Sequence, residues 1–186
     1  STPFDLESVD FLDPLMNFFK IASADINNIP LLRKIASKRK PIILSTGASE
    51  KNEINYAIST IEKEGLKKEN IILLHCILNY PTKDEDANLF MIKDLVNSYP
   101  SNLIGYSDHT LPNASMSVLS TAYLMGAVVI EKHFTDDKSL PGNDHYHSMD
   151  VSDLKNIRTN TEKIAKILGS ITVSYTHLRA HETEAY

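Results

Sequence analysis

Two short polar motifs carry the side chains best suited to chemistry. The motifs are 105-GYSDHT-110 and 131-EKHFT-135, and each places a histidine beside a charged residue directly after an apolar run. His109, His133 and Glu131 offer the imidazole and carboxylate ligands that Mn²⁺, Zn²⁺ and Fe²⁺ accept. The alternative is that both histidines are structural residues held by hydrogen bonds. The two motifs by themselves leave both interpretations open.

A second group of residues is suited to binding an anion. Lys20 lies inside the apolar run 18-FFKIAS-23, and lysine is almost never fully buried without a partner. Its side chain therefore either points toward an anion or extends outward along the protein wall. The turn 45-STG-47 precedes a predicted helix at 50–57, and the first N–H groups of a helix favour a phosphate or carboxylate. A simple N-cap is the alternative for that turn. Together with the histidines, these residues indicate metal-assisted chemistry on a small anion.

The elements that must position these side chains alternate between two types. Between short apolar runs, apolar residues recur at helical spacing near 29–36, 54–61, 89–95 and 116–123. The short runs are 18-FFKIAS-23, 41-PIILST-46, 70-NIILLHC-76, 102-NLIGYS-107 and 127-AVVIEKH-133. Because these runs are continuous, they are typical of strands buried on both faces. The alternation of strand and helix predicts βαβ units around a parallel sheet, in one domain over residues 1–169.

The polar strand ends favour a (β/α)8 TIM barrel over a doubly wound sheet. All carboxyl ends of barrel strands meet at one mouth, whereas an open sheet needs polar groups only near its switch point. The absence of a G-x-G-x-x-G motif also argues against dinucleotide binding. The segment 1-STPFD-5 reads as a strand end followed by a helix start. Five strands and part of a sixth are too few to close a barrel of about 250 residues. We therefore expect an α/β fold that is a partial barrel, with parallel strands and the helices outside.

Composition excludes several classes of protein. The chain has 186 residues, of which 42% are hydrophobic and 23% charged, as is ordinary for a globular protein. Its net charge of -5 gives no indication of nucleic-acid binding. The single cysteine, Cys76, excludes a disulfide framework and fits a reducing compartment. No apolar run approaches the roughly 20 residues that span a bilayer, and no signal peptide is evident. We expect a cytoplasmic protein with no membrane partner.

The ordered motifs also carry a resemblance that covers Ser1 to about Gly169. The chain resembles the sialic acid synthase family through STPFD, FKIASAD, ILSTGAS, LLHCILNYPT, GYSDHT and VVIEKHFT. Members condense phosphoenolpyruvate with an N-acylated hexosamine to give a nine-carbon sugar acid. The resemblance implies a (β/α)8 barrel, a C-terminal antifreeze-like domain and a homodimer. It places STPFD on the third strand and EKHFT on the eighth, so we expect the first two strands and the second domain to be missing from this sequence.

The resemblance also implies a role for particular residues. Five of them would hold phosphoenolpyruvate: Thr2, Lys20, Ser45, Asn79 and Ser107. Lys20 would face the phosphate as a catalytic cation, and Glu131 would be the catalytic acid/base or orienting carboxylate. His109 and His133 would bind a divalent metal, normally Mn²⁺, which would polarise the sugar aldehyde as a Lewis acid. Asp144 would contact sugar hydroxyls.

The loop 141-PGNDHYHS-148 departs from the family pattern because it is richer in histidine. We interpret His145 and His147 as loop polarity in preference to sugar contacts. The departure leaves the sugar open between N-acetylmannosamine and a di-N-acetylated 6-deoxyhexose that leads to legionaminic- or pseudaminic-type acids.

The tail at 170–186 has no counterpart in the family. The sequence VSYTHLRAHETEAY within it resembles a translated sequencing adaptor, so we exclude it from the fold as one would an expression tag. His177 and His181 stand four residues apart there, and we do not interpret them as a metal site.

Two further functions remain as alternatives. One is another phosphoenolpyruvate- or pyruvate-dependent sugar acid synthase or aldolase, for which Lys20 is the only obvious Schiff-base lysine. The other is a sugar-binding remnant without activity. We expect the chain alone to be inactive, because a barrel that lacks two strands has open edges and an incomplete site.

Overall fold

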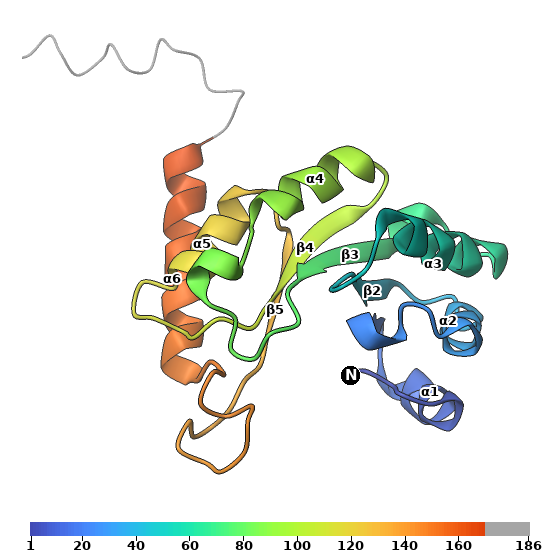
Figure 1. The fold of residues 1–186 in the computed structure, drawn as a ribbon, viewed down its shortest axis with the longest axis horizontal. Helices are drawn as coiled ribbons and strands as arrows, with labels where there is room; N and C mark the ends of the chain where they lie inside the picture. Colours follow the sequence, from blue (N-terminus) through green and yellow to red (C-terminus); the bar gives the residue numbers. More distant parts are fainter. Residues whose placement is uncertain (170–186) are drawn as a thin grey trace, which may run out of the picture.

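The computed structural model describes residues 1–169, which form a parallel sheet with helices packed outside it (Figure 1). The strands are β1 (Phe19–Ile21), β2 (Ile42–Ser45), β3 (Ile71–Cys76), β4 (Leu103–Asp108) and β5 (Val129–Lys132). Each strand pairs in parallel with the next along the chain, in the order β1-β2-β3-β4-β5. This unbroken order is that of a barrel wall, whereas the order in a doubly wound sheet reverses at a switch point. The expected partial (β/α)8 barrel is confirmed.

The helices follow the strands in alternation. They are α1 (Leu6–Leu12), α2 (Ile29–Ala36), α3 (Lys51–Lys63), α4 (Phe90–Ser98), α5 (Ser117–Leu124) and α6 (Val151–Leu168). Short 3-10 helices lie at Asp13–Leu15, Ser23–Asp25, Lys68–Asn70 and Asp84–Asp86. The side chains of Asp5, Asn28 and Asp150 accept N–H groups in the first turns of α1, α2 and α6. α6 ends at Gly169, which has a φ of 63°. None of the helices in residues 1–169 is long and apolar enough to cross a membrane.

The sheet has one apolar face and one polar face. Because successive side chains of a strand point to opposite faces, one set packs under the helices and the other faces the barrel interior. The outer set is buried in the hydrophobic core and includes Phe19, Ile21, Ile42, Leu44, Ile71, Leu73, Ile104 and Tyr106. The inner set lines a cavity at the carboxyl ends of the strands: Lys20, Ser45, Cys76, Ser107 and Glu131. This alternation explains how a lysine can stand inside an apolar run.

The beginning of the chain corrects one expectation. Ser1–Phe4 form no strand in the described structure, although the helix start after them is confirmed by the Asp5 cap. Proline has no N–H to give to a strand ladder, so Pro3 leaves this short segment with one donor fewer for pairing with β1. The interpretation of residues 170–186, including His177 and His181, lies outside the described residues.

The fold predicts that Gly105 in β4 tolerates no side chain. A Cβ atom there would overlap the carbonyl oxygen of Val129 and lie 2.5 Å from Leu74 Cδ2. We expect Gly105→Ala to lower the free energy of unfolding by about 1–3 kcal/mol or more, because a backbone atom of β5 must move. Urea unfolding measures this. Leu103→Thr, at an exposed position of the same strand, should change it by less than about 0.5 kcal/mol, and equal losses in both variants would contradict the prediction.

Candidate active site at the carboxyl ends of the strands

A cavity of about 510 Å³ lies at the carboxyl ends of the strands. Predicted site residues that line it are Thr2, Lys20, Ser45, Ser107, His109, Glu131 and His133. They come from the segment before α1, from β1, β2, β4 and β5 and from the turns that follow β4 and β5. Asn79 and Asp144 do not line the cavity. The structure therefore brings together most of the residues that the sequence singled out.

Lys20 points into this cavity and is 7% exposed. Its Nζ donates a hydrogen bond to the carbonyl oxygen of Ile21 at 2.8 Å and lies 3.6 Å from Glu131 Oε1. Ser107 Oγ donates to the same carboxylate oxygen at 2.8 Å. Burial lowers the pKa of the Lys20 ammonium, and the neighbouring Glu131 carboxylate opposes that change. The interpretation in which Lys20 extends outward is thus wrong, because its charge faces the cavity.

Ser45, which lines the same cavity on the neighbouring strand β2, has a buried hydroxyl, Oγ, that makes no hydrogen bond with the described residues. A buried polar group without a partner is destabilising by roughly 1–3 kcal/mol, so an oxygen or nitrogen of a bound ligand would relieve it. The start of α3, by contrast, is closed by a capping box in which the backbone N–H of Glu50 donates to Glu53 Oε2 at 2.8 Å. None of Ser45, Thr46 and Gly47 caps α3, so the interpretation of that turn as a simple N-cap is wrong.

A buried ion pair joins the two motifs that hold the histidines. Lys132 Nζ lies 2.6 Å from Asp108 Oδ2, and the two side chains are 0% and 1% exposed. Tyr106 Oη and the backbone N–H of Thr110 donate to Asp108 Oδ1 at 2.9 and 3.1 Å, and Lys132 also donates to the Thr110 carbonyl oxygen at 2.6 Å. Asp108 and Lys132 are direct neighbours across β4 and β5. Sequence reasoning missed this pair, although opposite charges at matching positions of the two motifs were the signal for it.

The pair of predicted metal ligands lies just beyond this ion pair. The rings of His109 and His133 have centroids 5.4 Å apart. His109 Nδ1 is 2.7 Å from the carbonyl oxygen of Ile77, so Nδ1 carries the proton and Nε2 keeps a lone pair for a ligand. Burial lowers the pKa of the His109 imidazole, which favours its neutral form. The ring of Tyr80 packs against the His109 ring, with centroids 4.2 Å apart.

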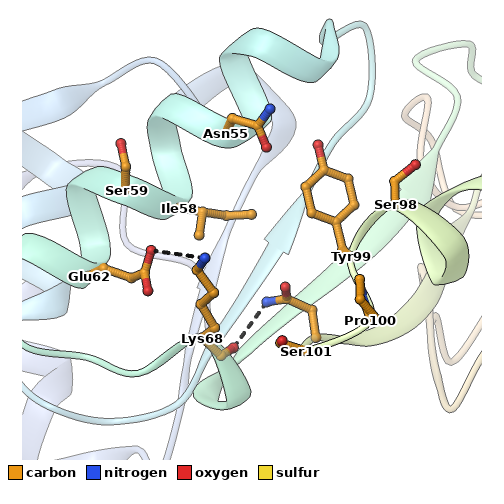
Figure 2. Close-up of a pocket in the computed structure, with 10 residues that line it drawn as sticks. Asn55, Ile58, Ser59, Glu62, Lys68, Ser98, Tyr99, Pro100 and Ser101 are labelled. Carbon is orange, nitrogen blue, oxygen red and sulfur yellow. Dashed lines mark hydrogen bonds and ion pairs between the residues drawn. The ribbon is translucent and has the colours of Figure 1, made fainter.

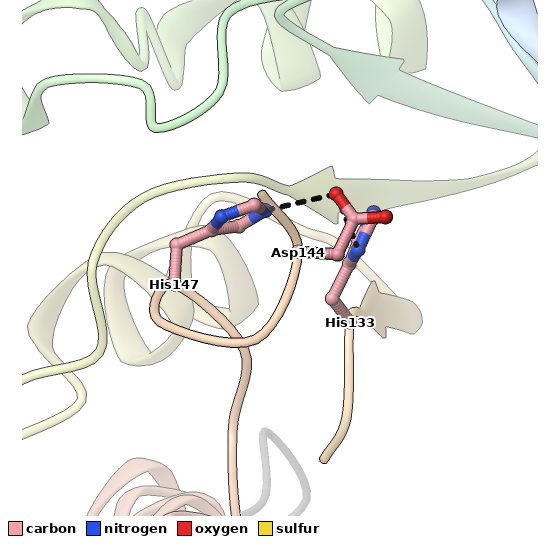
Figure 3. Close-up of side chains that lie close together, drawn as sticks. All are labelled: His133, Asp144 and His147. Carbon is pink, nitrogen blue, oxygen red and sulfur yellow. Dashed lines mark ion pairs between the residues drawn. The ribbon is translucent and has the colours of Figure 1, made fainter. Parts of the chain in front are cut away.

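Two residues of the loop after β5 approach His133. Figure 3 shows the Asp144 carboxylate beside the imidazoles of His133 and His147, with Oδ1 3.8 Å from His133 Nδ1 and 3.9 Å from His147 Nε2. One potential ligand atom from each residue lies within 4.8 Å of the other two. Burial and the nearby His133 lower the pKa of His147. The loop thus brings a carboxylate and an imidazole close to one of the predicted metal ligands.

The interpretation of His147 as loop polarity is wrong. Its side chain is 0% exposed, and neither ring nitrogen has a hydrogen-bond partner among the described residues. His145 differs, because its Nδ1 lies 2.7 Å from Thr135 Oγ1 and so stabilises the loop. Asn79 is exposed, and its carbonyl oxygen accepts a hydrogen bond from Thr82 Oγ1 at 2.8 Å. Its predicted contact with phosphoenolpyruvate stays a prediction.

A second hollow, of about 280 Å³, lies at the opposite end of the strands. Figure 2 shows it between α3 and the segment that leads into β4. Its polar groups are joined to one another: Lys68 Nζ lies 3.7 Å from Glu62 Oε2, and Asn102 Nδ2 donates to the Lys68 carbonyl oxygen at 3.0 Å. In barrel enzymes the amino-terminal end of the strands serves stability and the carboxyl end serves catalysis. The cavity around Lys20 is therefore the better candidate for the site.

Comparison with known proteins adds independent findings. A model of the NeuB family matches residues 1–173. The chain is 44% identical over 170 residues to an N,N'-diacetyllegionaminic acid synthase of Campylobacter jejuni, and this match covers 91% of the chain and 50% of the relative. It is 43% identical to a protein of the same name from Legionella pneumophila, with 91% of the chain and 48% of the relative covered. The chain thus spans about half the length of these relatives.

A solved structure has the same arrangement of strands and helices. The chain superimposes on the N-acetylneuraminic acid synthetase of Leptospira borgpetersenii, crystallised with citrate, with a TM-score of 0.84 and 37% identity. The superposition covers 95% of this chain and 61% of that one. The conformation of residues 1–169 is therefore that of a known synthase barrel.

The site predicts that the ion pair between Asp108 and Lys132 is essential for stability. Asp108→Asn leaves a buried ammonium without its counter-charge, so we expect the free energy of unfolding to fall by about 3–5 kcal/mol. Asp94→Asn is the matched control, because it removes the partner of the exposed Lys51, 2.9 Å away, and should lower that free energy by less than about 1 kcal/mol. Urea unfolding measures both variants. Similar small losses would show that the buried pair contributes no more than a surface one.

Proposed function

The chain belongs to the NeuB family, and on that premise we propose that it is the barrel part of a synthase that condenses phosphoenolpyruvate with an N-acylated hexosamine. The products would be a nine-carbon sialic-acid-type sugar acid and phosphate. The observation that carries the proposal is one cavity with two chemically different ends. One group, which we call the Lys20 end, consists of Lys20 and the unpartnered Ser45 hydroxyl on β1 and β2; the other, the histidine end, consists of His109 and His133 directly after β4 and β5.

The Lys20 end suits the anionic substrate. Phosphoenolpyruvate carries a phosphate and a carboxylate, and a buried ammonium with hydroxyl donors binds such groups through charge-assisted hydrogen bonds. Lys20 would bind the phosphate, while Ser45 and Thr2 would hold the remaining oxygens. Ser107, which also lines the cavity, keeps Glu131 in place through its hydrogen bond of 2.8 Å. The charge of Lys20 is only partly neutralised by Glu131 at 3.6 Å, so it remains available to a ligand.

The histidine end suits a divalent metal. His109 presents an unprotonated Nε2, and His133 is beside it with a ring-centroid separation of 5.4 Å. Burial raises the pKa of the nearby Cys76 thiol, so a soft thiolate ligand is disfavoured and Mn²⁺ fits the nitrogen and oxygen donors. When bound, such an ion polarises the carbonyl group of the sugar aldehyde. The resident metal is proposed to be Mn²⁺.

Glu131 occupies the position between the two ends. It lies on β5 one residue before Lys132 and two before His133, and its Oε1 faces both Lys20 and Ser107. In the proposed reaction, C3 of phosphoenolpyruvate forms a bond to the aldehyde carbon while the aldehyde C=O π bond opens, and water adds to C2. Glu131 Oε1 would accept one proton of that water and pass it to the former aldehyde oxygen, which becomes a hydroxyl group. The C2–O bond to phosphate then breaks, C2 becomes a ketone carbon, and phosphate leaves with the second proton of the water. Lys20 would stabilise the departing phosphate.

The remaining parts of the proposal concern the whole protein. The two N,N'-diacetyllegionaminic acid synthases, at 44% and 43% identity, support a di-N-acetylated 6-deoxyhexose as the sugar in preference to N-acetylmannosamine. Asp144, exposed beside the histidines, would contact that sugar. We further propose a cytoplasmic homodimer in which residues 1–169 are the barrel domain and 170–186 do not belong to it.

The reaction is tested by phosphate release from phosphoenolpyruvate in the complete protein that carries this chain. With a panel of N-acyl sugars and Mn²⁺, we expect release with the di-N-acetylated 6-deoxyhexose and loss of activity on chelation. His109→Ala or His133→Ala should abolish turnover while leaving the circular dichroism spectrum unchanged, because each removes a ligand of the metal. If both variants keep wild-type rates in metal-replete buffer, the ligand assignment is wrong.

The role of Lys20 is tested separately. Lys20→Met keeps the length of the side chain and removes its charge, so we expect kcat/KM for phosphoenolpyruvate to fall about 10- to 100-fold. Lys93→Met, at an exposed position on α4, is the control and should leave kcat/KM unchanged. Trapping of a substrate on Lys20 by borohydride, together with activity that resists chelators, would instead favour a Schiff-base aldolase.

A further inference from the structure

We propose that His147 and Asp144 are further ligands of the first-row divalent cation assigned above to His109 and His133, and that this ion lies at the loop after β5, among His133, Asp144 and His147. This inference deepens the proposed function, on which it rests for the presence of a metal but not for the identity of the sugar. It assigns to the loop a role that the strand ends do not supply. Figure 3 shows the three side chains that would meet at the ion.

The first argument is the state of the His147 side chain. Its 0% exposure and its two unpartnered ring nitrogens distinguish it from other buried histidines of the chain. His75 Nε2 contacts the Ala87 carbonyl oxygen at 2.8 Å, and His109 Nδ1 contacts that of Ile77 at 2.7 Å. Buried polar groups are nearly always hydrogen-bonded, and an exception calls for an explanation such as an ion. A cation next to His147 Nε2 provides that explanation.

The second argument is the separation of the ligand atoms. Atoms bound at about 2.1 Å from one ion in a tetrahedral arrangement lie about 3.4 Å from each other. Asp144 Oδ1 is 3.8 Å from His133 Nδ1 and 3.9 Å from His147 Nε2. These separations are too long for hydrogen bonds but need only a small contraction to fit an ion. Two imidazoles with one carboxylate suit Mn²⁺, Fe²⁺, Co²⁺ or Zn²⁺ better than Ca²⁺ or Mg²⁺.

The third argument is that the backbone holds the loop in place beside β5. Met149 N–H donates to the His133 carbonyl oxygen at 2.8 Å, and Thr135 N–H donates to that of Met149 at 2.9 Å. These two bonds form a parallel bridge between Phe134 and Met149. His147 precedes this bridge by two residues, so its distance to His133 is fixed by backbone hydrogen bonds. Asp144, with a side chain that is 69% exposed, leaves a path from solvent for the ion.

The proposal is tested by titrating the complete protein that carries this chain with Mn²⁺ and Zn²⁺ alone in a calorimeter. His147→Phe keeps a buried ring and removes both nitrogens, so we expect the dissociation constant to rise more than about 100-fold, since loss of an outer partner alone raises it 10- to 100-fold. Asp144→Asn, at an exposed position that does not endanger the fold, should raise it at least about tenfold. Leu140→Gln, at an exposed position of the same loop, is the control and should leave it within about threefold.

Each outcome of the titration separates this proposal from the proposed function. Suppose that folded His147→Phe and Asp144→Asn proteins bind the metal with the wild-type dissociation constant, whereas His109→Ala no longer binds it. Then His147 is not a ligand, and the synthase assignment stands. If His147→Phe fails to fold, the Asp144→Asn value decides alone, and wild-type affinity there overturns the proposed cluster. Weakened binding in both variants, with no phosphate release from phosphoenolpyruvate for any sugar, would support the ion site and contradict the synthase assignment.

Discussion

The buried ion pair between Asp108 and Lys132 is the constraint on which the geometry of the site depends. It joins β4 to β5 at their last paired position, and each partner stands directly before a histidine of the site. Because both charges are removed from water, an alternative register of β5 would leave two unpaired buried charges, which is strongly unfavourable. The additional donors from Tyr106 and Thr110 satisfy the other lone pairs of Asp108. The separation of His109 and His133 is therefore set by a pair of residues that need not touch any substrate.

Because side chains alternate along each strand, the same strand can contribute some residues to the hydrophobic core and the residues between them to the site. The outer face is filled with aliphatic and aromatic side chains packed under the helices, and its burial supplies the main favourable term in folding. The inner face can then hold Lys20, Ser45 and Glu131, none of which contributes to that core. Ser45 Oγ has no partner there and the pKa of Lys20 is lowered by burial. This local instability is tolerated because the outer face supports the strands.

Sequence reasoning predicted the strands and helices well because their signals are local. Continuous apolar runs and helical spacing identified all of β1 to β5, and polar strand ends located Lys20, His109 and His133 at one mouth. Sequence reasoning was wrong where long-range contacts determine the structure. The burial of His147 depends on the bridge between Phe134 and Met149, and the composition of the loop does not predict that bridge. The expectation of a strand at 1–5 was wrong for a related reason, since these five residues alone do not determine whether the segment pairs with β1.

The ligands differ in how firmly they are held, and this difference bears on specificity. His109 and His133 follow strands and are fixed by the sheet, whereas His147 and Asp144 belong to a loop tied back by two backbone hydrogen bonds. A ligand on a loop links the affinity for the ion to the conformation of that loop, because binding stabilises only the conformation that presents it. The same loop carries Asp144, the proposed contact to the sugar. Metal binding would therefore order the part of the site that distinguishes one sugar from another, and the strands would supply the part common to all of them.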